Sequence, residues 1–331
     1  MNQSVDQINR LNVALMLIVC GAAVYAPFHT FLFAYAFLGP LHYLTEISWL
    51  HDRGYFVARQ RERRLWLGFV ILTAAVMAYG YASTELFGRL VRPTLEIGLF
   101  YAVFALAAIV LLVRHPVNAF ALICVVAITL AGFSARPVYG IAAYLLMTIV
   151  HVFLFTGVFL VIGALKGKTH LGYLSVLVFL LSAATTLLVR APSVAPDAAV
   201  RGLYDSFLQL NEILLRFAGS DHTSAYASGV GISVMRFIAF AYAYHYLNWF
   251  SKTSIIGWHA IGPRRAWAIA LTWIAGVIVY AVDYRAGFAL FYVMSVTHVM
   301  LEFPLNHHSF ATLARPSLLK PRAGALAAVR S

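Results

Sequence analysis

Two pairs of side chains with the same spacing could carry chemistry in this sequence. His42 and Glu46 lie four residues apart near the end of a long apolar run, and His298 and Glu302 repeat the spacing near the C-terminus. On a helix, residues four apart leave the same face about one turn apart. Because an imidazole or a carboxylate in hydrocarbon is costly unless it is paired, binds a metal or faces water, we expect the two pairs to be used. They are predicted to be halves of one metal site.

Two further histidines in apolar segments, His151 and His245, could complete such a site. Imidazole nitrogens and carboxylate oxygens suit iron best in this interpretation, and they also suit zinc or manganese. The predicted metal ligands are His42, Glu46, His151, His245, His298 and Glu302.

The surroundings of the predicted ligands leave some roles open. Asn248 lies about one turn beyond His245, where it could orient a ligand without binding the metal. The flanking His51, His307 and His308 could complete the site, although solvated helix ends are the simpler interpretation. Only two cysteines occur, Cys20 and Cys124, both in apolar segments, so we expect neither a disulfide framework nor a thiolate metal site.

The elements that must position these residues are membrane spans. The chain has 331 residues, of which 62% are hydrophobic and only 11% charged, a composition outside the soluble globular range. We expect an all-α, polytopic bundle of about ten transmembrane helices, with residues 1–313 as one domain and 314–331 as a basic tail. A break is expected at Gly39-Pro40, just before His42. The predicted spans are 11–26, 28–50, 65–83, 94–113, 118–134, 139–165, 171–189, 229–250, 266–282 and 287–305.

The distribution of basic residues predicts the orientation of the bundle. With ten spans, the loops and ends on one side hold sixteen Lys and Arg residues, and those on the other side hold seven. The positive-inside rule then places both termini in the cytoplasm, most simply at a bacterial inner membrane. The net charge of +12 therefore reflects orientation, and we expect no nucleic-acid partner. In this topology the two His/Glu pairs and His245 all fall in the cytoplasmic halves of their spans.

Two features lie toward the outer side. Arg236, inside the span 229–250, needs an anionic partner, for which Glu96 and Asp283 are candidates; an anionic lipid headgroup is the alternative. The stretch 200–217 carries apolar residues at helical spacing and predicts an amphipathic helix that lies on the membrane or caps the bundle. We expect this helix to stay away from the metal, and substrate to enter sideways near Gly39-Pro40.

Three functions are compatible with this pattern. The first is a membrane metalloenzyme, iron-dependent and either mononuclear or di-iron, that oxidises, oxygenates or desaturates a lipid-soluble substrate such as an acyl chain, isoprenoid or carotenoid. Its partners would be the bilayer and that substrate. The second is an ion- or proton-coupled transporter or channel that uses the same residues. The third is a haem protein with axial histidines such as His151 and His298.

Overall fold

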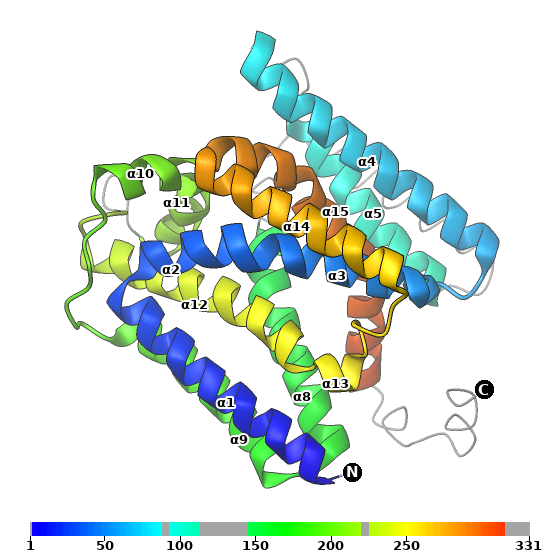
Figure 1. Ribbon diagram of the computed structural model, residues 1–331, viewed down its shortest axis with the longest axis horizontal. Helices are drawn as coiled ribbons and strands as arrows, with labels where there is room; N and C mark the ends of the chain where they lie inside the picture. The colour runs from blue at the N-terminus through cyan, green and yellow to red at the C-terminus, as the bar shows by residue number, and fades with distance from the viewer. Residues whose placement is uncertain (1, 88–92, 113–144, 220–224, 315–331) are drawn as a thin grey trace.

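All of the secondary structure in the described ranges is helical, in agreement with the predicted class. A computed structural model of the chain describes residues 2–87, 93–112, 145–219 and 225–314 (Figure 1). The predicted span 118–134 lies outside these ranges, as does the tail. The elements in chain order are α1 (Asn2–Tyr25), α2 (Pro27–Phe33), η1 (Ala34–Leu38), α3 (Gly39–Asp52), η2 (Gly54–Phe56), α4 (Gln60–Phe87), α5 (Pro93–Leu112), η3 (Leu146–Phe155), α8 (Thr156–Gly167), α9 (His170–Leu188), α10 (Ala198–Tyr204), η4 (Asp205–Phe207), α11 (Leu208–Phe217), α12 (Gly229–Ser251), α13 (Thr253–Ile256), α14 (Pro263–Val282) and α15 (Tyr284–Ala314).

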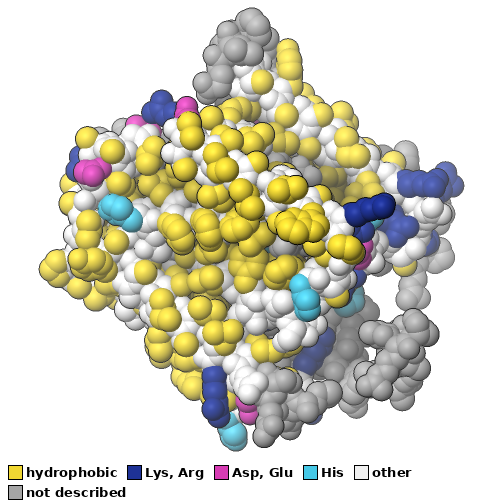
Figure 2. All heavy atoms as spheres, in the orientation of Figure 1, with side chains coloured by type: hydrophobic (Ala, Val, Ile, Leu, Met, Phe, Trp, Pro, Cys, Tyr) yellow, Lys and Arg dark blue, Asp and Glu magenta, His cyan; other side chains and the backbone are white. Residues whose placement is uncertain are grey.

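Six of the described helices are long and apolar enough to cross a membrane, which indicates a multi-pass membrane protein. They are Val5–Tyr25, Gln60–Ser83, Thr148–Gly167, His170–Leu188, Pro263–Val282 and Tyr284–Ala314. Large apolar side chains on several of them are exposed, for example Ile18, Leu188 and Trp267. Figure 2 shows hydrophobic side chains over most of one face, with charged side chains toward its margins. Such a surface is suited to lipid.

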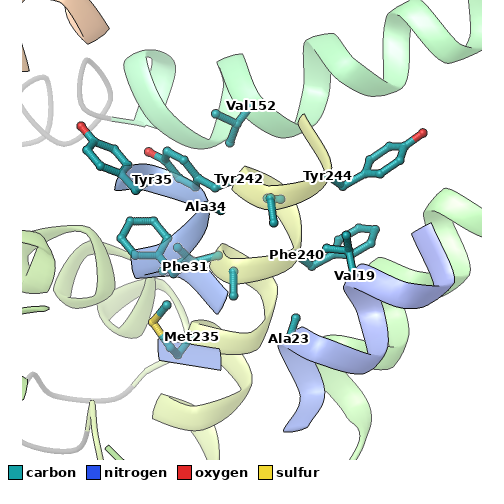
Figure 3. Packing of buried hydrophobic residues seen from close by; sticks show 14 of the residues in the cluster. Val19, Ala23, Phe31, Ala34, Tyr35, Val152, Met235, Phe240, Tyr242 and Tyr244 are labelled. Atoms are coloured by element: carbon teal, nitrogen blue, oxygen red, sulfur yellow. The ribbon is translucent and has the colours of Figure 1, made fainter. Parts of the chain in front are cut away.

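Helix α12 is the centre of the bundle. It contacts α1, α2, α3, α9, α11, η1 and η3, and most of its side chains are buried. In Figure 3, side chains of α1, α2 and η3 gather around those of α12, among them Phe240 and Tyr242. Because protein surrounds it, α12 needs no lipid-compatible surface. It can therefore carry polar residues such as His245 and Asn248 without exposing them to hydrocarbon.

The expected break at Gly39-Pro40 is instead a change of helix type. The chain remains helical from α2 through η1 into α3, and η1 is a short π-helix in which the amide of Gly39 donates to the carbonyl of Ala34. Proline cannot donate the next α-helical hydrogen bond, and the wider π turn accommodates this. The indole of Trp273 in α14 donates to the carbonyl of Phe37 at 2.9 Å. Helix α14 therefore supplies a hydrogen-bond donor to a main-chain carbonyl within the π-helical turn.

Arg236 corrects our expectation of a carboxylate partner. Its guanidinium is buried and donates to the main-chain carbonyls of Val24, Val189 and Ala191, at 3.0, 2.8 and 2.6 Å. These carbonyls lie at or just beyond the C-terminal ends of α1 and α9, where the helix dipole supplies partial negative charge. Asp283, a predicted partner, instead accepts from main-chain amides at the start of α15. Arg236 therefore ties two helix ends to α12.

The stretch 200–217 is two short helices and a 3-10 turn rather than one helix. Phe207 and Leu210 are buried, whereas Leu203 is 36% exposed, so the apolar face is buried over only part of its length. Tyr204 donates a hydrogen bond to Asn211, whose amide lies 3.6 Å from the sulfur of Met235 in α12. The segment is a packed cap on one end of the bundle (Figure 1).

Candidate metal centre

Four elements that are distant in sequence converge on one buried group of polar side chains. His42 and Glu46 come from α3, His245 from α12, and the other members come from η3 and α15. The complete group, called here the histidine cluster, is His42, Glu46, His151, His245, His298 and Glu302, and all six side chains are buried. The structure thus brings together every residue that the sequence predicted as a ligand.

Three histidines lie close enough to hold a metal ion. One ring nitrogen from each of His42, His245 and His298 lies within 4.8 Å of the others. The Nε2 atoms of His42 and His245 are 3.1 Å apart. His151 adjoins this triad, because its Nε2 lies 3.2 Å from Nε2 of His298. Nitrogens at these separations can share a cation with metal–nitrogen distances of about 2.0–2.1 Å.

The two carboxylates occupy different positions relative to the triad. Oε2 of Glu46 lies 3.0 Å from Nε2 of His42, the nitrogen that also faces His245. Oε2 of Glu302 lies 3.0 Å from Nδ1 of His151, on the opposite side of that ring from His298. Glu46 is therefore placed to bind the same ion as His42. Glu302 contacts His151 on the side of that ring away from the triad.

Thr156 contacts the ring of His245, and sequence reasoning missed it. Its hydroxyl donates to the carbonyl of Val152 at 2.8 Å and lies 2.9 Å from Nδ1 of His245. With the single hydroxyl proton assigned to the bond with Val152, the oxygen accepts from Nδ1–H of His245. The lone pair of that ring is then on Nε2, which faces the triad. A threonine at the junction of η3 and α8 carries no sequence feature that would reveal this role.

Several atoms of the cluster have no aligned hydrogen-bond partner. Nδ1 of His42, Oε2 of Glu46 and Oε2 of Glu302 are buried without one, although each carboxylate oxygen is 3.0 Å from an imidazole nitrogen. An unsatisfied buried polar atom costs about 1–3 kcal/mol. A carboxylate oxygen and an imidazole nitrogen that bind the same cation lie close together without a hydrogen bond between them. The contacts of Glu46 and Glu302 have this geometry. This donor set, nitrogen and oxygen without sulfur, suits iron, zinc or manganese.

The backbone around the cluster is also unusual. His151 lies in η3, a ten-residue π-helix, and η1 directly precedes the turn that carries His42. π-helical turns are rare and occur frequently at functional sites. Tyr43 adds an aromatic wall, because its ring stacks on His298 with centroids 4.3 Å apart. Its hydroxyl is 2.7 Å from that of Tyr246.

Four residues singled out by the sequence lie outside the histidine cluster. Asn248 faces the hydroxyl of Tyr244 at 3.4 Å, so its predicted role behind His245 is replaced by that of Thr156. His51 pairs with the hydroxyl of Tyr55 at 3.2 Å. Further along α15, His307 lies 3.0 Å from the carbonyl of Phe104 and His308 is exposed. The three flanking histidines therefore lie toward the ends of their helices, where His51 and His308 are exposed and His307 is partly buried.

A cavity of about 70 Å³ lies beside the histidine cluster. His151, His245 and His298 form part of its wall, and most of the remaining wall is aromatic or aliphatic. Apolar walls with a few polar groups are typical of ligand pockets, although the volume of this cavity is smaller than that of most such pockets. The other lining residues are Tyr35, Tyr43, Thr148, Val152, Phe207, Leu210, Tyr242, Tyr246, Phe288, Tyr292, Ser295, Val296 and Val299.

Comparison with known proteins adds no relative to this description. No protein-family model, curated protein or solved structure matches the chain. The interpretation of the site therefore depends on its geometry and chemistry.

Proposed function

We propose that this protein is an integral-membrane metalloenzyme that binds a non-haem metal at the histidine cluster and oxidises a lipid-soluble substrate. The observation that carries the proposal is the contact between the buried cluster and a mainly apolar cavity of about 70 Å³. A metal site without a substrate function would need no cavity beside its ligands. A binding pocket without redox chemistry would need no such group of buried imidazoles and carboxylates.

The proposed ligands are the triad together with Glu46. Three imidazoles and one carboxylate make a set that iron accepts, and zinc or manganese would fit as well. His151, held between Glu302 and His298, is placed either to bind the same ion or to support a second one. When bound, iron would supply one-electron chemistry and reactivity toward dioxygen, the proposed oxidant.

The residues of the chain have distinct roles in this proposal. Thr156 favours the tautomer of His245 that presents Nε2 to the triad, and Glu302 adds a carboxylate beside His151. The aromatic walls hold an apolar substrate beside the ligands and keep bulk water away from it, which strengthens electrostatic interactions in the site. The substrate would reach the protein from the bilayer.

Transport is the second candidate function. It is favoured by the interrupted helix α2–η1–α3 and by ionisable residues inside the bundle, both of which occur in transporters. The haem hypothesis is not retained. Axial ligation by His151 and His298 would require a flat macrocycle between two nitrogens that lie 3.2 Å apart.

Elemental analysis with an optical spectrum tests the proposal on the purified full chain. We expect bound iron and no Soret band in the wild-type protein, and loss of most of that metal in His298→Ala. The matched control is His308→Ala, which removes an exposed histidine from the same helix and should retain the metal. Equal metal content in the two variants would overturn the site. A folded wild-type protein without any metal would favour transport.

A further inference from the structure

One contact of the histidine cluster lies on the far side of His151 from the triad. Oε2 of Glu302 is 3.0 Å from Nδ1 of His151, whereas Nε2 of the same ring faces Nε2 of His298 at 3.2 Å. The lone pairs of the two ring nitrogens diverge, so an ion bound at Nδ1 lies away from the Nε2 side. A single cation at the triad therefore does not account for the contact between Glu302 and Nδ1.

The contact between Glu302 and His151 has the separation expected for two ligands of one cation. Nδ1 of His151 and Oε2 of Glu302 are buried, and neither has an aligned hydrogen-bond partner. With metal–ligand distances of about 2.1 Å, donors 3.0 Å apart subtend an angle of about 90° at the ion. This is the angle between neighbouring ligands in octahedral coordination.

The charge of Glu302 also calls for a positive partner. The side chain is buried, and no Lys or Arg in the described part of the chain forms an ion pair with it. A buried carboxylate without a partner is costly unless it binds a metal. A proton on Nδ1 of His151 would bond the carboxylate well only along the N–H direction, and the carboxylate oxygen lies off that direction.

Asn306 offers a third donor for such an ion. It lies four residues after Glu302 on α15, so the two side chains leave the same face about one turn apart. Asn306 is fully buried, and neither polar atom of its amide has a hydrogen-bond partner. Buried amides are normally bonded, because an unsatisfied one is costly. A side-chain carbonyl is a common ligand of divalent cations.

We propose that a second divalent cation binds on the side of His151 that faces away from the triad, held by Nδ1 of His151, Oε2 of Glu302 and the side-chain carbonyl of Asn306. This inference deepens the proposed function and rests on it for the first ion, which the triad and Glu46 bind. A neutral imidazole has one lone pair, so His151 serves the second ion and not the first. Each carboxylate of the histidine cluster then contacts one ion.

Counting metal ions per chain tests this inference. The full chain is purified in detergent, stripped of metal with a chelator, dialysed against iron(II) without oxygen and analysed for bound iron. We expect two ions per chain in the wild type and one in Glu302→Gln, which keeps the size of the side chain and removes its charge. Asn306→Leu should also bind one ion. Because the amide of Asn306 has no partner within the protein, this variant should not destabilise the metal-free chain.

The matched control is Asn248→Leu, which removes another buried amide, one that faces the hydroxyl of Tyr244. It should keep both ions. Two ions in every variant would overturn the second position. One ion in the wild type, unchanged in Glu302→Gln and Asn306→Leu, would overturn it as well and leave the proposed function standing. One ion that is lost in Glu302→Gln but kept in His42→Ala would instead overturn the triad site.

Discussion

One hydrogen bond, between the hydroxyl of Thr156 and the ring of His245, can orient a histidine for metal binding. With the hydroxyl proton of Thr156 assigned to the bond with Val152, Thr156 accepts from Nδ1–H of His245, and the Nε2 lone pair points toward the triad before any ion arrives. Replacing Thr156 with valine removes the hydrogen-bond acceptor and keeps the size of the side chain. The imidazole of His245 can then adopt either tautomer. We expect about 10–100-fold weaker metal binding, the usual cost of losing a residue that orients a ligand. Competition with a metal chelator measures this.

A matched control for that substitution is Thr186→Val. Thr186 is also fully buried, but its hydroxyl bonds only the carbonyl of Ala183 on its own helix. Both variants lose one buried side-chain hydrogen bond to a carbonyl, so both should lose a similar amount of stability. Only Thr156→Val should lose metal affinity. Equal affinities in the two variants would mean that Thr156 serves packing alone.

At the scale of elements, α14 and α15 approach closely through two glycines. A Cβ at Gly276 would lie 2.4 Å from the ring of Phe291, and one at Gly287 would lie 2.5 Å from the ring of Tyr280. Such contacts force side chains or helices to move, at a typical cost of about 1–3 kcal/mol. We expect Gly276→Ala to lower the unfolding temperature and also to weaken metal binding, because α15 carries His298.

The control for helix packing is Gly68→Ala in α4, where a Cβ would meet no atom within 4 Å. Alanine favours helix over glycine by about 1 kcal/mol, so this variant should be as stable as the wild type or slightly more stable. Unfolding followed by circular dichroism in the same detergent compares the variants. An unchanged unfolding temperature in Gly276→Ala would show that α14 can shift away from α15 without loss.

At the scale of the whole molecule, the helix ends form two groups. Asn9 in α1 donates to Thr169 at the α8–α9 turn, and Ser251 at the end of α12 donates to Asn12. At the opposite ends, the amide of Val194 donates to the carbonyl of Tyr25, which places the chain after α9 beside the end of α1. Figure 1 likewise shows the start of α1 and the end of α8 away from α10 and α11.

This arrangement makes the predicted ten-span topology testable. We expect the C-terminus and a site after Arg59 to be cytoplasmic and a site after Pro196 to be outside, because the positive-inside rule places the basic loops in the cytoplasm. Fusions to fluorescent protein and to alkaline phosphatase at each site measure this. Phosphatase activity from the C-terminal fusion would reverse the orientation or change the number of spans.

The sequence by itself determined the class of the molecule and the chemistry available to it. Composition and long apolar runs favoured membrane-spanning helices, because a helix satisfies its backbone hydrogen bonds within one segment. The spacing of His42 with Glu46 and of His298 with Glu302 placed each pair on one helix face, a property of local geometry that survives any packing. These features are periodic or compositional, and they need no knowledge of which helices are neighbours.

Only the tertiary structure decided which side chains meet. Glu302 lies against His151 of another helix rather than His298 of its own, and His245 is oriented by Thr156 rather than Asn248. Arg236 contacts carbonyls at helix ends in place of the carboxylates that charge alone suggested. The cap reaches the same cavity as the histidines because Phe207 packs between η1 and α15. Each contact joins residues tens to hundreds of positions apart, so it depends on helix packing, which periodicity along one helix does not specify.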